Sequence, residues 1–304
     1  MSGAIIECSG VTKLFGDFAA LNNVSLSVSP GTIGLLGPNG AGKSTLMKCL
    51  LQLHPISMGG ARLLGRDVGS EGREIRTRVG YAPEQDCLIS GMVGCEYVTY
   101  CAQLNGLPFQ EARQRAHEML DFVGMGQERY RAVDTYSTGM KQRVKLAQAI
   151  VHDPELVFLD EPTNGLDQSA RGFMLDTLFQ VVKQGGRSIL MSSHLMDDVE
   201  RICDRILMIH EGRVIAQGRI DDLKAIDREI EISVWGGASR MEQVLSDSGL
   251  KPRRSGRVMR VVRVDDSTYD LILECAVKAE VQVRKMEDYE PSLEDLFIVI
   301  MERL

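Results

Sequence analysis

Residues 37–45 of this 304-residue chain read Gly-Pro-Asn-Gly-Ala-Gly-Lys-Ser-Thr. A glycine, four further residues and then Gly-Lys-Ser is the pattern of a phosphate-binding loop, whose backbone amides turn inward around an anion. The apolar run Ile33–Leu36 precedes this loop, and a helical pattern over Lys43–Leu53 follows it. The sequence therefore predicts strand, loop and helix in the required order, with the positive end of the helix directed at the phosphates.

Each residue type in this loop suits one part of a nucleoside triphosphate. Lys43 is expected to bridge the terminal phosphates, Ser44 to ligate Mg²⁺, and Thr45 to hydrogen-bond a nearer phosphate. The alternative is an ordinary glycine turn before a helix, which the complete motif in this context disfavours. The residues predicted to contact nucleotide here are Gly37, Pro38, Asn39, Gly40, Ala41, Gly42, Lys43, Ser44 and Thr45.

A pair of acids supplies the second half of the predicted chemistry. The apolar run Leu156–Leu159 ends in Asp160 and Glu161, as a buried strand that delivers carboxylates to a site would. Asp160 is expected to hold the Mg²⁺ shell, and Glu161 to act as the general base that orients the attacking water. The alternative is an exposed acidic turn before Pro162, which the nearby phosphate loop makes the weaker interpretation.

The rest of the chain divides by its pattern. Short branched runs alternate with helical patterns over residues 5–223, which predicts an α/β core with a largely parallel sheet. A helical subdomain is expected at about 86–136, where Glu111–Val123 has helical spacing. The predicted domains are 1–225 and a small α+β module, 226–304. In that module we expect a helix over 239–248, a helix over 291–304, and strands over 229–235, 258–264, 269–275 and 280–285.

Composition excludes several classes of protein. Hydrophobic residues make up 44% and charged residues 25%, values typical of globular proteins rather than disordered or fibrous ones. No apolar run approaches the ~20 residues of a membrane span, and the N-terminus lacks a secretory pattern, so the cytoplasm is the expected compartment. The seven cysteines are scattered, which predicts no structural metal. The net charge of 35 − 42 = −7 disfavours general nucleic-acid binding.

Together these motifs resemble the nucleotide-binding subunit of an ATP-binding cassette (ABC) transporter over about residues 5–223. Tyr136–Arg143, YSTGMKQR, is similar to the family's signature sequence LSGGQ, with Ser137 and Gly139 matching and Thr138 and Met140 departing. The resemblance implies that Ser137 and Gly139 contact a terminal phosphate at a helix start. Read alone, the segment would be an ordinary helix cap.

Three further residues receive a role from the resemblance. Asp167, in Asn164–Asp167, resembles the D-loop aspartate that helps to join two subunits across the nucleotide. His194, after the run Ser188–Met191, resembles the switch histidine, which contacts the γ-phosphate and the region of the catalytic glutamate. Phe15 is similar to the aromatic residue that stacks on adenine, although a core position is an equal alternative.

One loop departs from the family pattern. The family's glutamine falls on Glu84, with Gln85 beside it, so either residue is a candidate Mg²⁺ or water sensor. This acid and the YSTGM signature resemble the branch of ABC ATPases that drives exporters with a separate membrane chain. The segment Pro291–Phe297 is similar to the C-terminal extension common in that branch.

The resemblance implies an Mg-ATPase that powers export. Two copies would close head to tail on ATP, with Lys43 of one copy and Ser137 of the other at each site. The helical subdomain would carry this motion to a groove for a cytoplasmic helix of a membrane permease, which places the protein on the cytoplasmic face of the membrane. Cofactors are expected to be ATP and Mg²⁺.

The alternatives are a soluble ABC ATPase without a membrane partner, an importer ATPase and a nucleic-acid ABC protein. A soluble ABC ATPase, such as a scaffold of iron–sulfur cluster assembly, typically lacks such a C-terminal module, and importers usually keep glutamine at position 84. Nucleic-acid ABC proteins carry two cassettes, a coiled coil or a zinc module. Six basic residues are compatible with phosphate binding, although a solvated hairpin is the favoured interpretation; they are Lys251, Arg253, Arg254, Arg257, Arg260 and Arg263.

Overall fold

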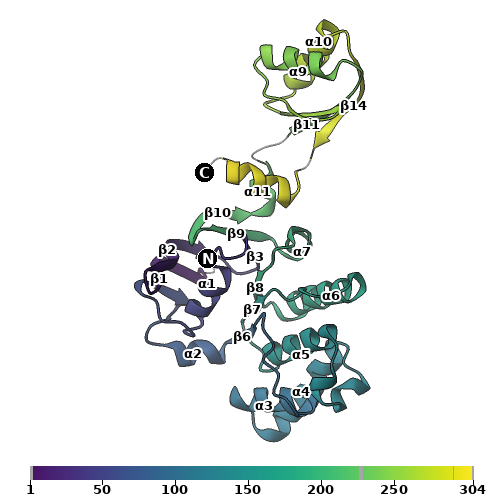
Figure 1. Cartoon of the computed structure of the whole chain (residues 1–304). Coiled ribbons are helices and arrows are strands. Elements are labelled where there is room, and N and C mark those ends of the chain that lie inside the picture. Colours follow the sequence, from purple (N-terminus) through teal and green to yellow (C-terminus); the bar gives the residue numbers. More distant parts are fainter. Residues whose placement is uncertain (1–2, 226–228, 290, 303–304) are drawn as a thin grey trace. The chain divides into compact units, whose positions relative to one another are not determined.

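The computed structural model describes residues 3–225, 229–289 and 291–302 (Figure 1). The chain forms two compact units, Met1–Gly218 and Arg219–Leu304, which are described separately. The domain boundary predicted after residue 225 adjoins residues 226–228, outside the described residues, and it stays a prediction.

A six-stranded sheet forms the centre of the first unit, with strand order β10-β9-β3-β8-β7-β6. The pairs β9–β3, β3–β8, β8–β7 and β7–β6 are all parallel. Every residue of β3, β7 and β8 is buried, as their continuous apolar sequences predict. The predicted α/β core is therefore confirmed, with strands β3 (Thr32–Leu36), β6 (Val79–Ala82), β7 (Leu156–Asp160), β8 (Ser188–Ser192), β9 (Arg205–His210) and β10 (Arg213–Arg219).

A second sheet, which the sequence analysis did not predict, contributes to the same core. It has the order β2-β1-β4-β5, and its β1–β2, β1–β4 and β4–β5 pairs are antiparallel. Its apolar side chains, such as Leu21 and Leu63, share one buried cluster with Leu46 and Met47 of α1. The sheet thus braces the helix that follows the phosphate loop; its members are β1 (Ile6–Phe15), β2 (Phe18–Val28), β4 (Met58–Leu63) and β5 (Arg66–Asp67), and the helix is α1 (Lys43–Leu50).

Three helices of the first unit lie close to one another (Figure 1). The helices α3, α4 and α5 lie together as a lobe (Figure 1), in which Ala112, Ala116 and Leu120 form the buried stripe of α4. This repeat of four residues is the spacing that places side chains on one helix face. The lobe comprises α3 (Gly94–Leu104), α4 (Phe109–Phe122), the short 3₁₀ turns Gln127–Tyr130 and Val133–Thr135, and α5 (Thr138–Ile150); the others are α2 (Gly72–Thr77), α6 (Gln168–Gly185) and α7 (Met196–Ile202).

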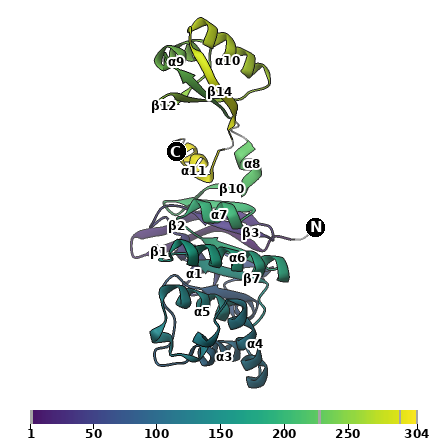
Figure 2. The same ribbon diagram turned by 90° about the vertical axis from the view of Figure 1, so that its right-hand side faces the viewer.

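The second unit is an α+β module, as predicted. Its sheet has the order β12-β13-β11-β14, with all neighbours antiparallel. Ile230, Ile232 and Val234 alternate into a core that α9 and α10 cover on one face (Figure 2). Its elements are α8 (Ile220–Ala225), β11 (Glu229–Trp235), α9 (Ala238–Asp247), β12 (Arg253–Ser255), β13 (Val258–Val262), α10 (Ser267–Lys278), β14 (Gln282–Tyr289) and α11 (Leu293–Glu302).

One prediction for this module is wrong. The segment 269–275 was expected to be a strand, but it lies within α10. Its apolar residues alternate over only a few positions, whereas the buried residues Thr268, Ile272, Cys275 and Ala276 recur at helical spacing. The longer 3.6-residue period therefore determines the structure.

No helix within the described ranges has the length and apolarity of a membrane span.

Candidate active site

Four neighbouring strands deliver the predicted site residues to one edge of the parallel sheet. The phosphate loop follows β3, and Ser193 and His194 follow β8. Asp160 is the last residue of β7, and Glu84 is the second residue after the end of β6. Parallel strands have their carboxyl ends at the same edge, where ligands of open α/β sheets bind. Motifs far apart in the sequence therefore come together.

Two glycines of the loop are required by close backbone contacts. A Cβ at Gly37, which has φ +154°, would lie 2.2 Å from the Ile209 carbonyl oxygen. A Cβ at Gly42, with φ +107°, would lie 2.7 Å from the Ala20 carbonyl oxygen. Only glycine fits at these positions, since both the space and the backbone conformation exclude a side chain.

The Lys43 ammonium is held inside the curve of the loop. Its Nζ donates hydrogen bonds to the carbonyl oxygens of Gly37 at 2.7 Å and Pro38 at 3.3 Å. The same Nζ lies 4.0 Å from Glu161 Oε1, and both side chains are buried. A positive charge confined here provides the complement to terminal phosphates.

Asp160 accepts two hydroxyl hydrogen bonds on one oxygen. Ser44 Oγ donates to Asp160 Oδ1 at 3.1 Å, and Ser192 Oγ donates to the same atom at 2.6 Å. A hydroxyl and a carboxylate at this separation form the hard oxygen donor set that suits Mg²⁺, which commonly takes few protein ligands together with waters and phosphate oxygens. The residues present therefore fit the expected metal.

Glu161 and His194 form a hydrogen-bonded pair. His194 Nδ1 lies 2.7 Å from Glu161 Oε2. The Glu161 backbone has φ +51°, a conformation that costs free energy for a residue with a side chain. The backbone N–H of Glu161 donates to Ser192 Oγ at 3.0 Å, so this serine supports both acids. Ser192 was not singled out in the sequence, because only the fold brings β8 beside β7.

A cavity of about 630 Å³ opens over these groups. Phe15 lines it, as do Phe18 and Asn164, which are among the lining residues that the sequence did not reveal. Phe15 and Phe18 are register partners at the β1–β2 turn, so the second aromatic residue could have been found from the Phe-Gly-Asp-Phe spacing. The other lining residues are Ala20, Pro38, Asn39, Gly40, Ala41, Gly42, Lys43, Ser44, Thr45, Glu84, Glu161 and His194.

The two candidate sensors differ in position. Glu84 lines the cavity, and Asn164 Nδ2 lies 3.5 Å from its Oε1. Gln85 is exposed and is not among the residues that line the cavity. This geometry favours Glu84 over Gln85 as the group that faces a bound nucleotide.

The predicted residues that do not line this cavity include three at helix N-termini. Ser137 is the N-cap of α5 and accepts the Met140 N–H at 3.3 Å, with Gly139 in the first turn. Asp167 is the N-cap of α6 and accepts the Ala170 N–H at 2.8 Å. Both cap side chains belong to exposed residues. One chain therefore does not bring its signature residues to its own phosphate loop.

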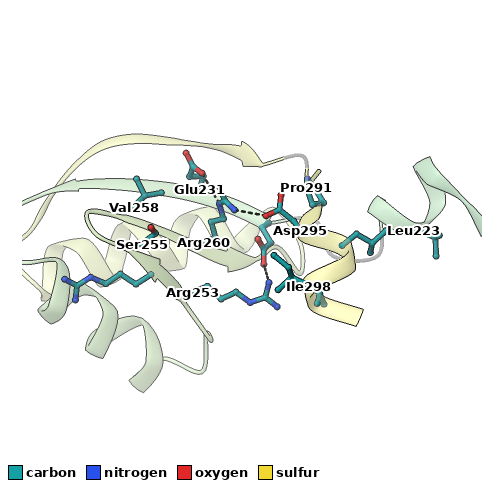
Figure 3. Close-up of a pocket in the computed structure, with 13 residues that line it drawn as sticks. Leu223, Glu231, Arg253, Ser255, Val258, Arg260, Pro291, Asp295 and Ile298 are labelled. Carbon is teal, nitrogen blue, oxygen red and sulfur yellow. Dashed lines mark hydrogen bonds and ion pairs between the residues drawn. The ribbon is translucent and has the colours of Figure 1, made fainter. Parts of the chain in front are cut away.

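A second cavity, of about 460 Å³, lies within the Arg219–Leu304 unit (Figure 3). Leu223, Leu296 and Val299 give it an apolar side. On its charged side, Arg260 contacts Glu231 at 3.0 Å and Asp295 at 3.4 Å. Ion pairs within the protein therefore balance much of the charge of this cavity.

Carboxylates also engage most of the basic cluster noted in the sequence. Besides Arg260, three arginines lie in ion pairs, namely Arg253 with Glu229, Arg254 with Glu242, and Arg263 with Asp266 and Asp288. This pairing favours the interpretation as a solvated hairpin. The absence of a nucleic-acid partner stays a prediction.

Comparisons with known proteins show the family to which the chain belongs. The sequence model of the family described as ABC transporter matches residues 21–164. The chain is 34% identical to the daunorubicin/doxorubicin resistance ATP-binding protein DrrA of Streptomyces peucetius, over 97% of this chain and 92% of the relative. It is 33% identical to the Nod factor export ATP-binding protein I of Sinorhizobium fredii (strain NBRC 101917 / NGR234), over 98% of this chain and 86% of the relative.

A solved structure of an ATP binding subunit of an ABC transporter is similar to 73% of this chain and 92% of its own, with a TM-score of 0.66 and 28% identity. The chain therefore belongs to the ABC transporter family, as an ATP-binding subunit. It is an ABC transporter ATPase, and the predicted family and fold class are confirmed. The matches to both relatives extend through the second unit.

Proposed function

We propose that this chain binds ATP with Mg²⁺ in the 630 Å³ cavity and hydrolyses it to drive export through a separate membrane permease. The observation that carries the proposal is the convergence of Lys43, Asp160 and Glu161 at one sheet edge. The names of the two relatives, a drug-resistance protein and an export protein, support the direction of transport. The protein would act at the cytoplasmic face of the membrane.

Each group has a distinct part in this proposal. Lys43 and the loop amides bind the β- and γ-phosphates, and Ser44 and Asp160 hold the Mg²⁺ that neutralises their charge. Glu161 orients the attacking water and accepts its proton. The 2.7 Å contact fixes the Glu161 carboxylate against His194, whose ring can reach the γ-phosphate. Phe15 and Phe18 supply the aromatic surface for adenine.

A second copy of this chain would complete the site. Ser137 and Gly139 lie at the start of α5, where N–H groups and a serine hydroxyl can bind a phosphate. Because the same chain's phosphate loop does not reach them, we infer a head-to-tail dimer in which each copy supplies one half of each site. Asp167, which caps α6, would lie at the contact between the copies.

The helical lobe offers a place for the permease. A cavity of about 200 Å³ is lined by Leu53, Asn105, Tyr81 and His152, among others. The exposed Leu104 provides apolar contact surface on α3.

The Glu161→Gln variant tests the hydrolytic function. It keeps the size of the side chain and removes its basicity, so we expect ATP binding to persist while turnover falls at least about a hundredfold. The trapped variant should form an ATP-dependent dimer in size-exclusion chromatography. The control is Glu155→Gln at the other end of the same strand, where the carboxylate pairs with Arg78. Wild-type turnover in Glu161→Gln would refute the assignment of the base.

A further inference from the structure

Four polar side chains on one face of α5, the signature helix that begins after Ser137, contact the segment that carries Glu84. These side chains follow the i, i+4, i+7, i+11 spacing of a single helix face, the last lying just beyond the helix end. They contact four of residues 79–86, in reverse order along the chain. These contacts are Lys141 with Asp86 Oδ2 at 2.7 Å, Lys145 with Glu84 O at 2.8 Å, Gln148 with Tyr81 O at 2.6 Å, and His152 with Val79 O at 3.2 Å.

Lys145 stands out among these four because it is 1% exposed. Burial lowers the pKa of its ammonium, and the negative charges around it, which include Asp86, Asp160 and Glu84, act in the opposite direction. Removing such a charge from water is costly unless its hydrogen bonds are specific. A purely structural role in a helix core would be served as well by an apolar side chain of similar length.

The hydrogen-bond partner of Lys145 belongs to a residue that lines the nucleotide cavity. The Glu84 carbonyl accepts its hydrogen bond, while the Glu84 side chain lines the nucleotide cavity. The helix that carries Lys145 begins at the Ser137 cap. This contact therefore helps to join the loop at one ATP site to the helix that presents Ser137.

We propose that Lys145 is a positioning residue that fixes Glu84 over the nucleotide and couples its position to the signature helix. The proposal rests on the proposed ATPase function of the same cavity. Lys145 is not among the residues that line the nucleotide cavity, so its effect on catalysis would pass through the backbone of Glu84. A displaced Glu84 would impair turnover more than it impairs ATP binding, which depends on the phosphate loop.

A double-mutant cycle tests the proposal with purified full-length protein. We expect Lys145→Met to lower kcat for ATP about tenfold or more while KM changes less than about threefold. In a Glu84→Ala background, the same substitution should change kcat less than about twofold, because its effect is already lost. The control Gln148→Leu removes the adjacent hydrogen bond to the Tyr81 carbonyl. It should change kcat by the same factor in the wild-type and the Glu84→Ala backgrounds.

The results separate the two hypotheses. Suppose that Glu84→Ala lowers kcat, while Lys145→Met lowers kcat by the same factor in both backgrounds or does not lower it. The positioning role of Lys145 is then refuted, and the ATPase function stands. If Glu84→Ala keeps wild-type kcat, the role of Glu84 falls and that of Lys145 with it.

Hydrogen exchange gives a second readout that does not depend on turnover. Amides 84–87 should exchange faster in Lys145→Met than in Gln148→Leu at equal global stability. Equal protection of this loop in the two variants would overturn the proposal.

Discussion

Ser192 is expected to stabilise both acids of the site, and Ser192→Ala tests this. Its hydroxyl donates to Asp160 Oδ1 at 2.6 Å and accepts the Glu161 N–H at 3.0 Å, at a fully buried position. Loss of a hydrogen bond to a carboxylate together with a neutral one costs about 2–4 kcal/mol. For a unit of this size, that lowers Tm by about 4–16 °C.

The assay is thermal unfolding of wild type and variant at pH 7 without nucleotide. Ser188→Ala is the matched control on the same strand, because Ser188 Oγ accepts a hydrogen bond from the neutral Gly31 N–H, at 3.2 Å. We expect about 1 kcal/mol for this change, or about 2–4 °C. A Tm shift in Ser192→Ala no larger than in Ser188→Ala would refute the reasoning, because the carboxylate contact would then contribute nothing.

Two further predictions concern the loop and an ion pair. Gly37→Ala places a Cβ 2.2 Å from the Ile209 carbonyl, so ATP affinity should fall at least about tenfold in fluorescent-nucleotide titration; Gly40→Ala, with no atom within 4 Å, should cost only about 1–2 kcal/mol of backbone strain. Hydrogen bonds from Arg78 lower the pKa of Glu155, so this pair stabilises the fold above the ordinary carboxyl pKa and loses its effect as pH falls through the lowered value. The Tm difference between wild type and Arg78→Met should therefore be present at pH 7 and vanish in acid, and a constant difference would contradict it.

Local sequence predicted much of the site because its motifs are contiguous. The loop 37–45 and the pair Asp160 and Glu161 each lie at the end of a short, fully buried strand, so residue order alone places them at a strand end. The parallel sheet then brings the two strand ends together. Nothing in either motif had to be inferred from a distant part of the chain.

The residues that the sequence did not reveal act across the fold. Ser192 and Lys145 contact Asp160 and Glu84, which lie 32 and 61 positions away. Neither has a motif of its own, since a buried serine or lysine acquires its role only from the neighbouring strand. The strand wrongly predicted at 269–275 has a different cause, because its local alternation competed with a longer helical period.

The central claim is that each ATP site is shared between two copies of this chain. Mixing the inactive variants Lys43→Ala and Ser137→Ala tests it most directly. A mixed dimer would contain one intact site, formed by Lys43 of one copy and Ser137 of the other. Random pairing makes half of the dimers mixed, so ATPase activity should recover to about a quarter of wild type. If the mixture stayed as inactive as either variant alone, the shared site would be contradicted.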